Sequence, residues 1–164
     1  MTNNTDPQLT DSDIQSVQYI LQDYKSEPSE IASPENVAFI KEALSTLENK
    51  EGNIEASFEE LWAEQVGPPQ QFAGPSGKSL WQVTLEVVRK EICGDDGFRS
   101  KVLDYNKNPA SAASLTGLIV YLVSLTTLPI NPAIATIIVL YILKVGLNIF
   151  CEYTEPKTAE ATEL

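Results

Sequence analysis

The stretch that decides the fold is LIVYLVSLTTLPINPAIATIIVLYIL, residues 118–143. It lies in an apolar run from position 110 to position 150, in which Lys144 is the only charged residue. Pro129, Asn131 and Pro132 interrupt this run. The residue before a proline disfavours helix, whereas Asn followed by Pro is a typical helix start. We therefore interpret the interruption as a turn between two helices.

Asn-Pro-Ala also occurs at 108–110, so we expect one helix over about 109–128 and another over about 132–151. Each would contain about 20 residues and cover about 30 Å, the thickness of a hydrocarbon core. The short turn requires an antiparallel hairpin, which we interpret as two transmembrane spans. One alternative is a soluble helical bundle with the hairpin at its centre. Another is strands, since LIVYLV and ATIIVLYIL are rich in β-branched residues.

Three basic residues lie just before the first predicted span: Arg99, Lys101 and Lys107. The positive-inside rule then predicts that both termini are cytoplasmic. We expect a bacterial inner-membrane location, with a cytoplasmic protein as the alternative. In outline, a helical region followed by a two-span hairpin resembles the small membrane effectors and adaptors of bacterial conflict systems. The resemblance concerns topology and transfers no functional residue.

Small and polar residues at spacings of three and four predict where the two spans contact each other or line a pore. The predicted residues are Ala110, Ser114, Gly117, Tyr121 and Ser124 in the first span, and Tyr141, Lys144 and Asn148 in the second. For Lys144 we expect a side chain that extends toward the membrane surface. A polar contact in a helix assembly, or a cation lining a pore, is the functional alternative.

The remainder of the chain predicts short amphipathic helices, because apolar residues recur every three or four positions. The predicted order is a disordered tail (1–10), an acidic helical region (11–66), a Pro/Gly linker (67–78), amphipathic helices (79–107), the hairpin (108–151) and an acidic disordered tail (152–164). Helix starts are predicted at Ser33–Pro34 and at two capping boxes, Ser57 with Glu60 and Ser79 with Gln82. After Ser79, the apolar face would include Leu80, Val83, Val87 and Ile92.

Trp62 and Trp81 have two interpretations. Aromatic side chains dominate binding hot spots, so both are candidates for contacts with a protein partner. Packing in the core is the simpler alternative.

Charge and composition exclude several functions. The net charge is −12, and residues 1–66 contain 14 acidic and 3 basic residues, which argues against binding to nucleic acid. The chain has no histidine, the commonest general base and metal ligand. Cys93 and Cys151 lie far apart, and we interpret them as reduced thiols, with a disulfide as the alternative. The polar N-terminus does not have the pattern of a secretory signal.

Two short motifs resemble ligand-binding loops but lack residues that those loops require. GPSGKS (74–79) ends like a phosphate-binding loop, but Phe72 stands where that loop requires glycine. GDDG (94–97) lacks the alternating ligands of a calcium loop and predicts a turn. We therefore expect no cofactor, metal or catalytic site.

The sequence thus predicts a non-enzymatic, membrane-anchored all-α protein. Its helical module would bind a protein partner or form a homo-oligomer, and its hairpin would lie in a lipid bilayer and could perturb it. The alternative is a soluble adaptor subunit whose hairpin is buried in its own core or by a partner.

Overall fold

The computed structural model describes residues 8–22, 33–67, 79–109 and 111–153. All regular secondary structure in these ranges is helical, as predicted. The helices are α1 (Asp11–Gln22), α2 (Pro34–Asn49), α3 (Ile54–Gln65), α4 (Leu80–Ile92), α5 (Asp96–Lys107), α6 (Ala112–Leu125), α7 (Pro132–Val145) and α8 (Leu147–Tyr153).

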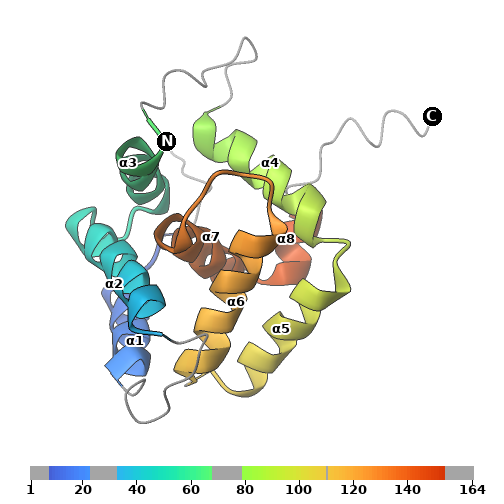
Figure 1. The fold of residues 1–164 in the computed structure, drawn as a ribbon, viewed down its shortest axis with the longest axis horizontal. Helices are drawn as coiled ribbons and strands as arrows, with labels where there is room; N and C mark the ends of the chain where they lie inside the picture. Colours follow the sequence, from blue (N-terminus) through green and yellow to red (C-terminus); the bar gives the residue numbers. More distant parts are fainter. Residues whose placement is uncertain (1–7, 23–32, 68–78, 110, 154–164) are drawn as a thin grey trace.

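Helix α7 lies in the middle of the bundle (Figure 1), where it contacts α2, α3, α6 and α8. Every residue from Ala133 to Ile142 is buried. A helix that is apolar on all sides must be covered on all sides. Here the other helices of the chain cover it, which is the arrangement that the bundle alternative predicted.

The predicted membrane-length spans differ from the observed helices. α6 and α7 contain 14 residues each, or about 21 Å at 1.5 Å per residue. α6 ends at Leu125, before Pro129, and α7 ends at Val145 because Gly146 has a φ of +99°. Among the described residues, no helix combines the length and apolar character needed to cross a membrane. The prediction of two transmembrane spans is therefore unsupported.

Several helix starts follow local capping chemistry. Ser33 accepts a hydrogen bond from the Asn36 amide before Pro34, and Asn131 accepts one from the Ile134 amide. The predicted capping box of Ser79 with Gln82 is also present. These caps confirm three of the predicted starts.

Two predicted starts are wrong. α3 begins at Ile54 with Asn53 as its cap, and the Ser57 hydroxyl donates to the Asn53 carbonyl instead of starting a helix. Asn108 ends α5, and Ser111 caps α6. In each case a polar residue three or four positions away satisfies the first free amides.

A row of aromatic rings connects α3, α4, α7 and α8. Trp81 lies between Phe58 (ring centroids 4.9 Å apart) and Tyr141 (5.3 Å), and Tyr141 contacts Phe150 (6.1 Å). Burial of Trp81 rotates α4 away from its predicted apolar face, so Val83 is exposed. The sequence pattern had placed Val83 inside and left Trp81 undecided.

Ordered structure begins before α1. Leu9 is buried, and its amide donates to the Gly52 carbonyl (3.0 Å), although residues 1–10 were predicted as a disordered tail. The predictions for residues 1–7, for the linker at 68–78 and for the tail beyond Tyr153 lie outside the described residues.

Candidate functional site

The predicted contact stripe of the first span does not face α7 as a unit. Tyr121 faces α5: its hydroxyl donates to Asp95 Oδ2 (2.7 Å), and the Lys101 ammonium lies 5.4 Å from its ring centroid. Ser114 and Gly117 are half-buried, and the exposed Ser124 donates to the Tyr121 carbonyl. Ala110 lies outside the described residues.

The predicted stripe of the second span divides among three places. Tyr141 is buried in the aromatic row. Lys144 forms an ion pair with Asp13 of α1 (Nζ to Oδ2, 2.9 Å). Asn148 Oδ1 accepts a hydrogen bond from Arg99 (3.0 Å). The structure therefore gives Lys144 a protein partner in place of a membrane surface.

The turn residues lie in the loop that joins α6 to α7. Pro129 is exposed, while Asn131 and Pro132 are half-buried at the start of α7. Neighbouring Ile130 is buried in the core. The turn is therefore packed onto the bundle and is not a free tip.

Trp62 and Trp81 are 2% and 0% exposed. Neither ring presents a surface that a partner could contact in this structure. Their position agrees with the core-packing alternative.

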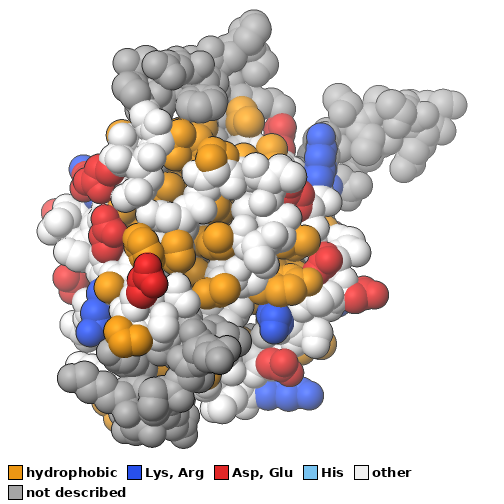
Figure 2. Space-filling view, viewed as in Figure 1, with side chains coloured by type: hydrophobic (Ala, Val, Ile, Leu, Met, Phe, Trp, Pro, Cys, Tyr) orange, Lys and Arg blue, Asp and Glu red, His pale blue; other side chains and the backbone are white. Residues whose placement is uncertain are grey.

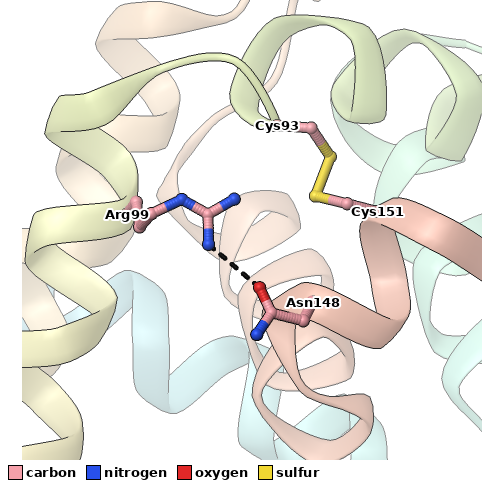
Figure 3. The surroundings of a disulfide bond; sticks show 4 residues. All are labelled: Cys93, Arg99, Asn148 and Cys151. Atoms are coloured by element: carbon pink, nitrogen blue, oxygen red, sulfur yellow. Dashed lines mark hydrogen bonds between the residues drawn. A yellow bond between two sulfur atoms is a disulfide. The ribbon is translucent and has the colours of Figure 1, made fainter.

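A groove of about 390 Å³ lies between α5 and the α7–α8 junction. Leu103 and Ile149 are 54% and 57% exposed on its walls, and Val102 and Leu147 lie deeper. Arg99 and Asn148 connect the two walls through their hydrogen bond (Figure 3). Its apolar walls and few polar groups suit a binding surface more than a catalytic centre.

Charge is distributed unevenly along the sequence. Acidic side chains lie on both sides of the visible face, with basic side chains among them on each side (Figure 2). In the sequence, residues 1–66 have a net charge of −11 and residues 67–150 a net charge of +2. The groove therefore lies in the half of the chain that is close to neutral.

Cys93 and Cys151 form a disulfide that ties the end of α4 to α8 (Figure 3). Their Cα atoms are 5.8 Å apart. The expectation of two reduced thiols is therefore wrong for this structure, because α8 folds back and brings the distant cysteine to α4. The closed loop contains α5, α6 and α7.

Three carboxylates hold successive parts of the α6–α7 hairpin. Asp95 accepts the hydroxyl of Tyr121 in α6, and Asp13 pairs with Lys144 in α7. Glu91 accepts from the Thr126 hydroxyl (2.5 Å) and from the Thr127 amide (3.0 Å) and hydroxyl (2.7 Å) in the connecting loop. We call Asp13, Glu91 and Asp95 the latch carboxylates.

Each latch carboxylate has a pKa below its ordinary value. A hydrogen bond from the Thr10 amide, followed by one from Lys144, lowers the pKa of Asp13. Burial opposes ionisation of Glu91, but its hydrogen bonds from the loop together outweigh burial and lower its pKa. The Tyr121 hydroxyl, followed by the Phe98 amide, lowers the pKa of Asp95. All three are therefore most strongly bonded when ionised.

Within the described ranges, no group of three or more His, Cys, Asp or Glu residues could hold a metal ion. Sequence reasoning missed the groove walls Leu103 and Ile149 and the latch carboxylates. The hairpin residues that bind Glu91 and Asp95 lie 26 or more positions away, so no local pattern reveals these contacts.

Comparisons with protein-family models, with curated proteins and with solved structures find no match for this chain.

Proposed function

We propose that this chain is a helical binding protein that self-associates through the α5–α8 groove, with a second copy as the occupant. The observation that carries the proposal is the pair of large apolar side chains, Leu103 and Ile149, exposed on facing walls of one groove. Isolated exposed apolar residues are ordinary, but a pair that lines a groove is typical of an interaction surface.

The charge distribution favours a second copy in a two-fold arrangement. Two molecules of net charge −12 repel each other, and the repulsion is weakest when their acidic halves point away. Facing grooves achieve this, since residues 67–150 are close to neutral. Remaining repulsion is screened over about 8 Å at physiological salt. A two-fold contact, in which each groove meets the other, is the commonest symmetry among homo-oligomers.

The test is sedimentation velocity over a wide range of protein concentration, with the variants Leu103→Asp and Ile149→Asp. Burial of one such side chain contributes about 1.5–3 kcal/mol, so each variant should weaken dimerisation by about tenfold or more. Tyr19→Asp is the matched control, because Tyr19 is 68% exposed on α1, away from the groove.

The expected result is a wild-type dimer that dissociates in both groove variants but not in the control. A wild type that stays monomeric at every concentration overturns the proposal. So does a dimer that Tyr19→Asp weakens as much as the groove variants.

A membrane activity is the second candidate, and the observation that favours it is the apolar surface of α7 on every side. That surface is covered by protein in this structure, so membrane activity requires the bundle to open.

A further inference from the structure

The α6–α7 hairpin is apolar enough to suit a lipid environment, and polar contacts hold it to the rest of the bundle. Residues 111–143 contain no charged side chain, and Lys144 stands near the end of α7. Transfer of residues 111–143 into lipid would therefore not require any charged side chain to lose its water. The polar groups that fasten it to the rest of the bundle include the three latch carboxylates. Asp13 in α1, Glu91 in α4 and Asp95 at the start of α5 bind α7, the loop and α6, respectively.

We propose that acid releases the α6–α7 hairpin from the bundle and that the released hairpin enters an anionic lipid bilayer. This activity is independent of self-association through the groove. The released hairpin is the part of the chain that contacts lipid, and an anionic phospholipid surface is its binding partner.

Protonation weakens each fastening in a different way. Protonated Asp13 loses its ion pair with Lys144, and protonated Asp95 becomes a weaker acceptor for Tyr121. Protonated Glu91 loses the charge that strengthens three hydrogen bonds from Thr126 and Thr127. Hydrogen bonds to a charged group are roughly twice as strong as those between neutral groups.

The side chains that bind the latch carboxylates do not titrate in the same range. Asp13 shares its surroundings with Lys144 and Tyr105, and Tyr121, which meets Asp95, lies beneath Lys101. The contacts of Glu91 are the hydroxyls and amide of the loop. Lysine and tyrosine keep their protons in acid, so within each bonded pair only the carboxylate changes charge.

The sign of the effect follows from the lowered pKa values. Ordinary values for these groups are 3.8 for aspartate and 4.5 for glutamate. Stabilisation by the latches is complete above about pH 4.5 and is lost as the pH falls through the lower pKa values of the folded protein. At an anionic surface of −30 to −50 mV, the local pH lies roughly 0.5–0.8 units below the bulk value.

The charge of the whole molecule changes sign in the same range. The chain has 23 acidic and 11 basic residues and a sequence pI of about 4.3. An anionic membrane therefore repels the protein near neutrality and attracts it in acid. The disulfide keeps the ends of the 93–151 loop together, which suits entry of a hairpin from one side of a bilayer.

The test uses the full chain with vesicles of phosphatidylcholine and phosphatidylglycerol that contain a photoactivatable phospholipid. Labelled peptides are identified by mass spectrometry at pH about 3 and about 7. We expect labelling concentrated between residues 112 and 145 in acid on anionic vesicles. Pure phosphatidylcholine vesicles, and anionic vesicles near pH 7, should give little labelling of this segment.

The latch variant is Asp13→Asn, Glu91→Gln and Asp95→Asn together. It should be labelled at a higher pH than the wild type, with a midpoint shifted upward by at least half a unit. The control is Asp11→Asn, Glu64→Gln and Asp104→Asn, which changes net charge equally at three exposed carboxylates. Circular dichroism near pH 7 establishes which variants fold.

The wild-type labelling map decides the proposal even where the latch variant does not fold. Absence of labelling between 112 and 145 in acid overturns it. Equal labelling of α1–α3 and of the hairpin also overturns it, because general unfolding onto the surface would then explain the binding. Latch and control variants with the same midpoint refute the role of the latch carboxylates.

Discussion

Removal of the Cys93–Cys151 disulfide by the double substitution Cys93→Ser and Cys151→Ser should destabilise the protein strongly. The two cysteines are separated by 58 positions, and the chain-entropy relation for a loop of that length gives about 4 kcal/mol. For a chain of this size, a loss of this magnitude corresponds to a decrease in Tm of about 10 °C. The main cause is the larger conformational freedom of the unfolded chain.

The assay is urea unfolding followed by circular dichroism, with oxidised wild type, reduced wild type and the double variant. Reduced wild type and the variant should have similar midpoints, both well below that of the oxidised protein. Titration of thiols in the unfolded, unreduced wild type should detect none. A loss below about 1 kcal/mol, or free thiols in the unreduced protein, would refute the reasoning that the bridge constrains the α5–α7 segment.

Three further changes test the core, one turn and one latch. Ile137→Ala, at a fully buried position of α7, should cost about 2–5 kcal/mol in urea unfolding, and a cost near zero would mean that α7 is not the centre of the core. Gly52→Ala should cost more than about 1 kcal/mol, because Gly52 has a φ of +83° and a Cβ would lie 1.9 Å from the Leu9 carbonyl oxygen. The control is Gly94→Ala, whose Cβ would meet no atom within 4 Å, and it should unfold like the wild type. Glu91→Gln should lower the free energy of unfolding near pH 7 by about 1 kcal/mol, and the difference from wild type should shrink below pH 4.5, the ordinary pKa of the group. A difference independent of pH would contradict the claim that ionised Glu91 holds the loop.

Local sequence chemistry predicted the helical class and several helix starts. Ser33–Pro34, Asn131–Pro132 and Ser79 with Gln82 each cap a helix as expected. Each cap is formed by residues three or four positions apart, so the local sequence alone is enough to predict it. Where the prediction of a start was wrong, at Ser57, a nearby Asn53 was the competing cap.

The environment of the apolar hairpin could not be read from the segment itself. A helix apolar on every side fits both lipid and the centre of a bundle, and the choice depends on how many other helices can cover it. The glycine at position 146 was a local signal that the second span is short, because glycine often ends a helix. In the structure, α7 ends there, and Gly146 has a positive φ. The length estimate overlooked that signal.

The candidate site depends on contacts between distant parts of the chain. Lys144 meets Asp13 across 131 positions, and Arg99 meets Asn148 across 49. The sequence singled out Lys144 and Asn148 as polar residues in an apolar run, but it could not supply their partners. Likewise, α8 alone brings Cys151 to Cys93.

Amide hydrogen exchange of the protein in detergent-free buffer near pH 7 tests most directly whether α7 is the centre of the folded bundle. Buried central elements open only with global unfolding, so the amides of residues 136–145 should exchange more slowly than those of α1 or α8. Their protection should correspond to the free energy of unfolding measured in urea. Exchange in α7 as fast as in α1, or a protein that remains folded only in detergent, would contradict the account.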